Sequence, residues 1–170
     1  MAPTTSPIVP PSPRPVKMIL KTGLLAGFLD IAAACTSFFL QTGTNPLVVL
    51  QFIASGILGQ SAFTGGYPVA LLGLLLHFFI AFIFAGLYFF MYSRLPFLRR
   101  NVFWSGVGYG LFIWLVMNGL VLPLSLAPRR PFAFIPNLIE VFILVGAMGL
   151  PIAWLIHRHY QRMHQKPGAV

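Results

Sequence analysis

Long apolar runs dominate the sequence, and the polar residues are concentrated between them. Four runs cover roughly residues 18 to 40, 68 to 93, 102 to 123 and 132 to 156. A helix needs about 20 apolar residues to cross the hydrocarbon of a bilayer. Lipid offers no partners for backbone amides, and these runs lack the alternation typical of barrel strands. The pattern therefore predicts an all-α integral membrane protein, a four-helix bundle over residues 17–160.

The segment between the first two runs is uncharged, but polar residues and glycines interrupt it. Asn45 followed by proline is a good helix start. Gln51, Ser55 and Gly59 then recur every fourth residue, which gives a helix over about 46–60 a stripe of polar or small residues. At about 14 residues this helix is too short to span the bilayer, so we expect it to be interfacial or re-entrant on the outer side. It is either a lid or pore-lining segment or, as we favour, a hydrophobic cap over the bundle.

The composition supports a membrane protein. The 170-residue chain is 58% hydrophobic and only 8% charged, which is more apolar surface than a soluble domain of this size can bury. A net charge of +9 would suggest nucleic-acid binding in a soluble protein. Here the basic residues flank the apolar runs, so membrane lipids are the expected partners and no nucleic acid is predicted.

The basic residues also predict an orientation. Nine of the eleven lie before or at the start of the first run, between the second and third, or after the fourth: Arg14, Lys17, Lys21, Arg94, Arg99, Arg100, Arg158, Arg162 and Lys166. Only Arg129 and Arg130 lie between the third and fourth runs. Because cytoplasmic loops carry an excess of Lys and Arg, both termini are predicted to be cytoplasmic. Tyr92, Trp104 and Trp154 fall near the predicted cytoplasmic interface, where amphipathic rings settle.

The two ends of the chain differ in composition from the apolar runs. Residues 1–16 hold six prolines and no apolar periodicity, so they are predicted to be a disordered tail. Residues 161–170 are predicted to be a cytoplasmic tail. The stretch HRHYQRMH, which begins at His157, could be a metal or acid sensor, but a basic end that binds anionic headgroups is favoured. The lone Cys35 excludes an intramolecular disulfide and is interpreted as a packing residue.

Both acidic residues of the chain, Asp30 and Glu140, lie inside apolar runs. At about 1.5 Å of rise per residue, Asp30 is roughly 15 Å below the outer end of its helix. His77 and Glu140 lie at a similar depth in theirs, Asn137 is one turn from Glu140, and Asn118 is shallower. The predicted site is therefore a buried polar cluster of Asp30, His77, Glu140, Asn118 and Asn137.

A bare carboxylate at this depth costs roughly 2.5 to 3.5 kcal/mol on insertion scales, so the acids need partners. We expect His77 to lie between them, protonated or donating a hydrogen bond, with Asn118 or Asn137 satisfying the remaining oxygen atoms. Such a cluster could relay or sense protons, could only fix the helix register, or could hold a metal ion. No HxxxH or ExxH spacing supports the metal, and no metal or cofactor is predicted.

Motifs of enzymes are missing from the sequence. It holds no nucleophile elbow, no P-loop and no metal-binding helix with paired histidines, and one intramembrane histidine cannot give bis-histidine haem ligation, so the chain is predicted not to be an enzyme. The basic pair Arg129 and Arg130, in the stretch PRRP, is unexpected on the outer side. It could bind a lipid headgroup or an anionic solute, Arg129 could reach toward Glu140, or the pair could be an interfacial anchor.

The order of these features resembles a known group. A buried acid in the first run is followed by LHFFIAFIFAGLYFF, LVMNGLVLPLSLAPRRPF and NLIEVFILVGAMGLPIAWLIHR. Over about residues 20 to 160 the chain resembles the small four-span bacterial inner-membrane proteins that include the YagU-like group. Members of that group carry a histidine in the second span and a histidine-rich or acidic fourth span, which His77 and Glu140 match; the shorter outer connection and Asn118 depart from it. The resemblance implies a bacterial plasma-membrane location and a part in envelope or acid stress.

Two functions fit these patterns. The first is a proton-linked conduit or a sensor of pH or envelope stress. The second is a non-catalytic scaffold or accessory subunit whose faces of small residues bind other membrane helices, including a second copy of the chain. A water-filled path from the polar cluster to the outer surface would favour the first, and a cluster sealed among Phe and Leu side chains would favour the second.

Overall fold

The computed structural model describes residues 15–129 and 133–164, which are helical apart from short connections. The helices are α1 (Pro15–Thr42), α2 (Leu47–Leu58), α3 (Gly66–Arg94), α4 (Phe97–Arg100), α5 (Val102–Val116), α6 (Leu122–Leu124), α7 (Phe134–Ile143) and α8 (Leu150–His164). A 3₁₀ turn, η1 (Gly59–Thr64), follows α2, and two π-helical turns, η2 (Met117–Val121) and η3 (Leu144–Gly149), follow α5 and α7. The described residues contain no β-strand, so the fold is all-α.

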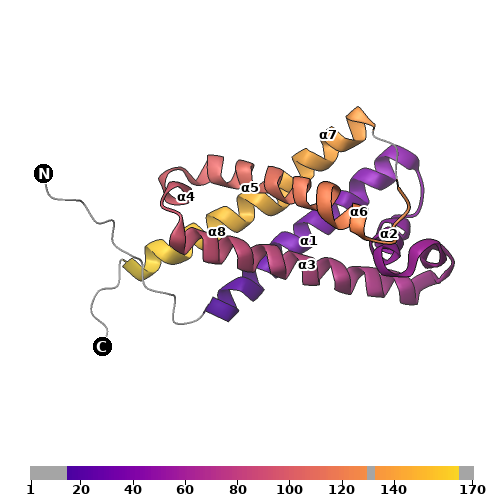
Figure 1. Cartoon of the computed structure of the whole chain (residues 1–170), viewed down its shortest axis with the longest axis horizontal. Coiled ribbons are helices and arrows are strands. Elements are labelled where there is room, and N and C mark those ends of the chain that lie inside the picture. The colour runs from indigo at the N-terminus through magenta and orange to yellow at the C-terminus, as the bar shows by residue number, and fades with distance from the viewer. Residues whose placement is uncertain (1–14, 130–132, 165–170) are drawn as a thin grey trace, which may run out of the picture.

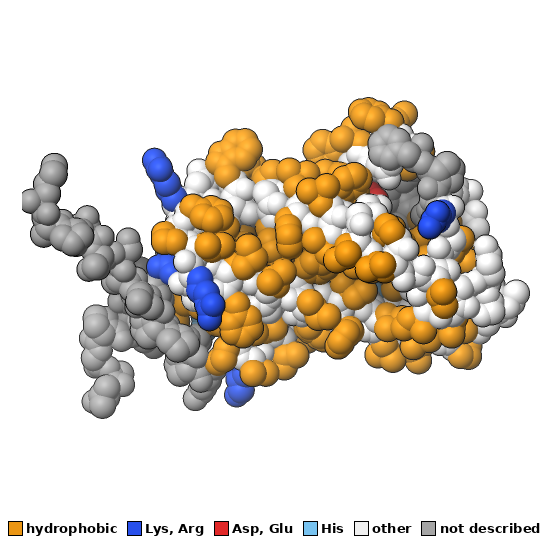
Figure 2. Space-filling model, in the orientation of Figure 1, with side chains coloured by type: hydrophobic (Ala, Val, Ile, Leu, Met, Phe, Trp, Pro, Cys, Tyr) orange, Lys and Arg blue, Asp and Glu red, His pale blue; other side chains and the backbone are white. Residues whose placement is uncertain are grey.

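Within the described residues, five segments are long and apolar enough to cross a membrane: Pro15–Thr42, Leu47–Thr64, Gly66–Arg94, Val102–Leu124 and Phe134–Met163. Large hydrophobic side chains cover much of the face seen in Figure 2, and many of them are more than half exposed. Contiguous apolar surface of this extent is stable in lipid rather than in water. The chain is therefore a multi-pass helical membrane protein.

Four long helical segments run along the molecule and pack on one another (Figure 1): α1, α3, α5 with η2 and α6, and α7 with η3 and α8. α2 and η1 instead lie together at one end. Gly59 breaks this segment with a φ of +62°, a conformation that glycine adopts without steric cost. The backbone N–H of Leu126 donates to the carbonyl of Gly56 at 3.0 Å, which ties the connection after α6 to α2.

The helix ends differ from the predicted boundaries at both ends of the domain. Helix α1 already begins at Pro15, within the tail predicted over residues 1–16, and a proline fits the first turn of a helix. Residues 1–14 of that tail, and residues 165–170 of the predicted cytoplasmic tail, lie outside the described part. Helix α8 continues beyond the predicted end at residue 156, as far as His164. It continues because its inner stripe stays buried, with Tyr160 only 3% exposed.

Both π-helical turns are explained by prolines. Pro123 follows η2 by two residues, and Pro151 follows η3 by two residues. Proline has no N–H to donate to the carbonyl four residues earlier, and its ring clashes with that carbonyl. These carbonyls belong to Gly119 and Ala147, both inside the widened turns. A π turn opens the backbone where the regular hydrogen bond is missing.

Glycines allow three pairs of helices to approach closely. In α5, Gly106 and Gly110 face Gly149 of η3, where an added Cβ would overlap the Gly106 carbonyl oxygen. In α3, a Cβ on Gly73 would overlap the carbonyl oxygen of Leu50 in α2. The third contact is between α1 and α3, at Gly27. Small residues drive such packing because membrane helices associate through close van der Waals contact.

Candidate functional site

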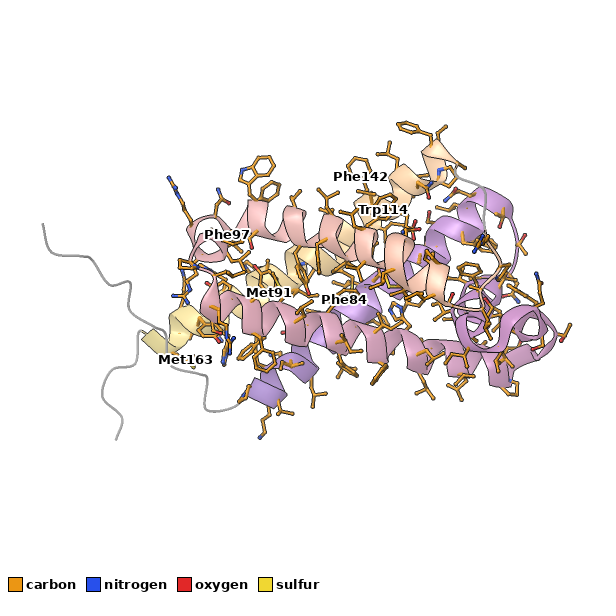
Figure 3. The ribbon with its side chains drawn as sticks, in the orientation of Figure 1. Phe84, Met91, Phe97, Trp114, Phe142 and Met163 are labelled. Atoms are coloured by element: carbon orange, nitrogen blue, oxygen red, sulfur yellow. The ribbon has the colours of Figure 1, made fainter. Side chains whose placement is uncertain are left out.

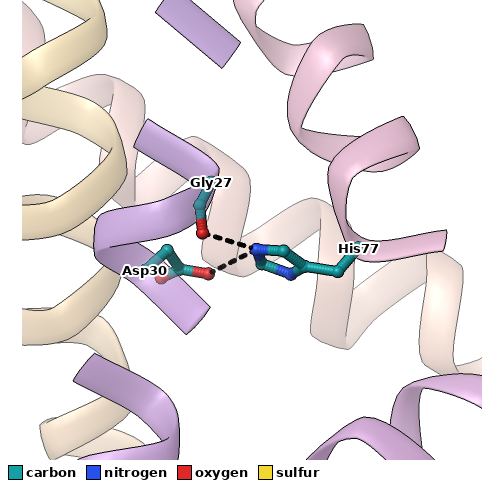
Figure 4. Close-up of polar contacts among 3 residues, drawn as sticks. All are labelled: Gly27, Asp30 and His77. Carbon is teal, nitrogen blue, oxygen red and sulfur yellow. Dashed lines mark hydrogen bonds and ion pairs between the residues drawn. The ribbon is translucent and has the colours of Figure 1, made fainter. Parts of the chain in front are cut away.

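Asp30 lies on the buried face of α1, which packs against α3. The buried residues of α1 recur at helical spacing and are Thr22, Gly23, Ala26, Gly27, Asp30 and Ile31. At Gly27 the two helices almost touch, because an added Cβ would lie 3.0 Å from Cβ of Ala81 and from Cδ1 of Phe78. This close approach brings the imidazole of His77, on α3, to the carboxyl group of Asp30 and to the backbone of Gly27 (Figure 4).

His77 makes one hydrogen bond and one longer charged contact through the same nitrogen. Its Nε2 lies 2.9 Å from the carbonyl oxygen of Gly27 and 3.9 Å from Oδ2 of Asp30. A carbonyl oxygen only accepts, so Nε2 carries the hydrogen and donates it to Gly27. The distance to Asp30 is too long for a hydrogen bond but falls within the range of an ion pair. The two side chains are only 11% and 13% exposed, respectively.

The pair is therefore best able to hold one titratable proton between its two groups. Charged imidazole beside charged carboxylate is neutral overall, and so is neutral imidazole beside a protonated carboxyl group. Gain or loss of a further proton leaves a net charge in a poorly hydrated interior, which costs several kcal/mol. Groups coupled in this way titrate together, not independently.

Glu140 has a different partner from the one predicted. Its Oε2 accepts a hydrogen bond of 3.3 Å from Nε1 of Trp114, which links α7 to α5. The hydrogen-bond partner of Glu140 is therefore an indole, whereas the sequence pattern predicted His77 between the two acids.

The two asparagines do not complete a cluster. Nδ2 of Asn118 donates to the carbonyl of Trp114 in its own helix, at 3.2 Å. Asn137 is half-buried, one turn before Glu140, and no hydrogen bond joins its side chain to Asp30 or His77. The predicted five-residue cluster is thus wrong as a single buried assembly, and the structure brings together only Asp30 and His77. The similar depth of Asp30, His77 and Glu140 along their helices did not determine toward which neighbour each side chain points.

The outer basic pair is only partly described. Arg129 is exposed, and Arg130 lies outside the described residues. In the described part of the chain the contact between His77 and Asp30 is the only ion pair within 4 Å, so Arg129 does not reach Glu140. No group of three His, Cys, Asp or Glu side chains within residues 15–129 and 133–164 could hold a metal ion.

A second polar contact was not predicted from the sequence. Tyr92 was assigned to the membrane interface and His157 to a solvated basic end, but Tyr92 is only 3% exposed. Its hydroxyl lies 2.6 Å from Nδ1 of His157, which joins α3 to α8, and Nε2 of Gln161 lies 2.7 Å from Nε2 of the same imidazole. The available signal was the spacing of Ile152, Ile156 and Tyr160, which marks an inward face of α8.

Buried aromatic residues surround this second contact. The ring centroids of Tyr92 and Tyr160 are 5.0 Å apart, and those of Tyr88 and Tyr109 are 4.7 Å apart. The hydroxyl of Tyr88 lies 2.6 Å from Oγ of Ser105, which joins α3 to α5. Aromatic packing in which the hydroxyls of Tyr88, Tyr92 and Tyr109 are hydrogen-bonded is typical of a rigid core. We therefore interpret this end of the bundle as structural.

The fold and the paired ionisable groups define a multi-pass helical membrane protein with a buried acid–imidazole contact. Comparison with family models, with curated proteins and with solved structures finds no match to the chain.

Proposed function

We propose that the chain is a four-crossing protein of the bacterial plasma membrane in which Asp30 and His77 form the proton-linked element of a conduit or sensor. The observation that carries this proposal is the 3.9 Å approach of two ionisable groups from two different helices, both buried. Ionisable groups inside membrane spans are costly and usually mark ion or proton pathways. No enzymatic activity is part of the proposal.

The proposed topology has four crossings, with both termini cytoplasmic. The segment Leu47–Thr64 is apolar enough to cross, but it is broken at Gly59 and lies at one end of the bundle (Figure 1). Most of the blue Lys and Arg side chains in Figure 2 lie at the opposite end. Five crossings would place the termini on opposite sides of the membrane. Protease accessibility of tags at both ends, in inverted vesicles, tests this, because tags on opposite sides would contradict it.

Protonation of the pair would act on the contact between α1 and α3. The imidazole donates to the Gly27 backbone, so its position depends on a helix that also carries Asp30. Gain of a second proton leaves the imidazolium beside a neutral carboxyl group, and loss of the shared proton leaves a neutral imidazole beside a carboxylate. Either change removes the ion-pair attraction, whereas the hydrogen bond from Nε2 to Gly27 remains. A change in proton occupancy therefore alters how strongly the two helices are held together. The envelope or acid-stress role implied by the YagU-like resemblance is consistent with such a response.

Proton flux into liposomes tests the conduit. Protein reconstituted around a pH-sensitive dye is given an outer acid pulse, and the wild type is expected to acidify the lumen faster than empty liposomes do. Asp30→Asn and His77→Ala are expected to reduce the rate to that of empty liposomes. Ser105→Ala is the matched control, because it breaks another contact between helices, the Tyr88–Ser105 bond, that lacks a carboxylate and an imidazole.

Helix content and elution as one species establish that the variants fold. Wild-type flux that equals the empty-liposome rate, or a folded Asp30→Asn variant that keeps wild-type flux, would contradict the conduit. The sensor is tested by the pH dependence of the thermal unfolding midpoint. We expect this dependence to be weaker in Asp30→Asn than in Ser105→Ala, and equal dependence in the two variants would contradict the sensor.

A specific observation favours the scaffold as a second candidate. Helix α7 has no buried residue, and its Phe142 points away from the bundle and is 68% exposed (Figure 3). An adjoining helix would cover this face. If another helix covers this face, Leu138→Cys in a Cys35→Ser background should form cross-linked products in native membranes. Leu75→Cys, on the lipid-facing side of α3, is the control and should form none.

A further inference from the structure

A groove of about 550 Å³ lies where α3 ends and α5 begins. Met91, Tyr109 and Phe112 line its apolar part, and Trp104 stands at its side with 66% of its surface exposed. Met91 and Phe97 in Figure 3 mark its position near the basic end of the bundle. The groove is therefore apolar, open to the lipid-facing side, and close to one membrane surface.

The same groove has a cation at its edge. Arg100 lines it and is exposed. The neighbouring Arg99 is already engaged by the backbone, because its guanidinium donates to the carbonyl oxygens of Tyr92 at 3.2 Å and Ser93 at 2.6 Å. Asn101 also lines the groove, and its Oδ1 accepts from two backbone N–H groups in the first turn of α5. Arg100 is thus the basic side chain that the groove presents to a ligand.

No acidic side chain opposes this cation. The two acids of the chain, Asp30 and Glu140, belong to the middle of α1 and to α7, and neither lines the groove. An apolar trough that ends at an uncompensated guanidinium is complementary to a molecule with a hydrocarbon tail and an anionic head. Anionic phospholipid is the abundant molecule of that chemistry at the surface of a bacterial plasma membrane.

We propose that this groove binds an anionic phospholipid. One acyl chain lies along Tyr109 and Phe112, and the phosphate contacts the guanidinium of Arg100. Trp104 stands at the level of the headgroups, where indole rings are enriched. The lipid would fill the groove between the end of α3 and the start of α5 and hold both at the membrane surface.

Native mass spectrometry of the detergent-solubilised protein tests the site. The protein is titrated with phosphatidylglycerol and, separately, with phosphatidylcholine carrying the same acyl chains. Wild-type protein is expected to retain one phosphatidylglycerol in preference to phosphatidylcholine. Arg100→Gln should weaken phosphatidylglycerol binding about fivefold, since one basic residue at a membrane surface contributes about 1 kcal/mol.

Filling the groove is an independent test. Gly108 lines it, and an added Cβ there meets nothing within 4 Å, so Gly108→Leu projects into the groove without disturbing the backbone. This variant should lose the bound lipid. Arg94→Gln and Gly119→Leu are matched controls: Arg94 is an exposed basic residue outside the groove lining, and Gly119 is equally open but lies in η2. Both should bind as the wild type does.

Several results would overturn the proposal. Equal retention of the two lipids would show that the headgroup charge is not recognised. A loss in Arg94→Gln as large as that in Arg100→Gln would indicate diffuse attraction to a basic surface. A dimer that excludes lipid, and that Gly108→Leu disrupts, would identify a second copy of the chain as the occupant.

Discussion

The imidazole of His77 is held more closely by the backbone of Gly27 than by the carboxyl group of Asp30. Nε2 lies 2.9 Å from the Gly27 carbonyl oxygen and 3.9 Å from Oδ2 of Asp30. The backbone bond exists because a residue without a side chain lets α3 approach α1. The candidate site therefore depends on a glycine as well as on its two ionisable groups.

Gly27→Ala should destabilise the protein. The new Cβ would meet Ala81 and Phe78 at 3.0 Å, and overpacking of this kind costs about 1 to 3 kcal/mol. The matched control is Gly108→Ala, where a Cβ meets nothing within 4 Å and replacing a helical glycine contributes roughly 0.5 to 1 kcal/mol of stability. Thermal unfolding in detergent measures both variants. A Gly27→Ala midpoint at or above that of Gly108→Ala would contradict the close contact.

Gly73→Ala should loosen α2 from the bundle. A Cβ on Gly73 would overlap the carbonyl oxygen of Leu50, so α2 has to move. Cys35 reports this movement, because its Sγ lies 3.9 Å from the carbonyl oxygen of Pro46 at the start of α2. Maleimide should label Cys35 severalfold faster in Gly73→Ala than in the wild type. Gly86→Ala, on the same helix but with only ordinary contacts to Ile19, should leave the labelling rate unchanged.

The long helices were predictable because hydrocarbon imposes a strong constraint on length and polarity. The first three apolar runs fall within helical segments of the structure, and the fourth is helical from Phe134 onward. The break at Gly59 was not predicted, because Gly59 was placed on the stripe of the helix expected over about 46–60. Asp30 and His77 could be placed on inward faces because glycine and alanine share those faces. Small residues and buried polar groups repeat at the same helical period, so each supports the other.

The direction in which Glu140 faces could not be predicted in the same way. Glu140 precedes η3, and a π turn shifts the residues before it relative to a regular helix. Regular helical geometry therefore does not relate the side of Glu140 to that of residues beyond η3. The burial of Tyr92 was missed for another reason: an amphipathic ring suits both a membrane interface and a core with a hydrogen-bond partner. Only the neighbouring α8 distinguishes these two environments.

The hydrogen bond between Tyr92 and His157 should contribute to stability. Tyr92→Phe removes the hydroxyl that lies 2.6 Å from Nδ1, and one such bond is worth about 1 kcal/mol. A double-mutant cycle with His157→Ala isolates the pair, and the coupling energy should be about 1 kcal/mol. Tyr67→Phe is the control, because Tyr67 is 77% exposed. Additive effects of Tyr92→Phe and His157→Ala would show that the bond contributes nothing.

The contact between α5 and η3 offers two glycines within one π turn that should respond oppositely to the same change. A Cβ on Gly149 would overlap the Gly106 carbonyl oxygen and lie 2.7 Å from the amide nitrogen of Gly110, whereas a Cβ on Gly146 meets nothing within 4 Å. Gly149→Ala must separate the helices. It should lower the free energy of unfolding by about 1 to 3 kcal/mol, and so lower the thermal unfolding midpoint.

Gly146→Ala should leave the midpoint unchanged or raise it, because alanine restricts the unfolded chain more than glycine does. Both substitutions lie in the same widened turn before Pro151, so any general effect of alanine on the π turn affects both variants. The difference between the unfolding midpoints of the two variants therefore measures the backbone contact at Gly149 alone. If the two variants unfold at the same temperature, the crossing at Gly106 and Gly110 does not hold the last span in place.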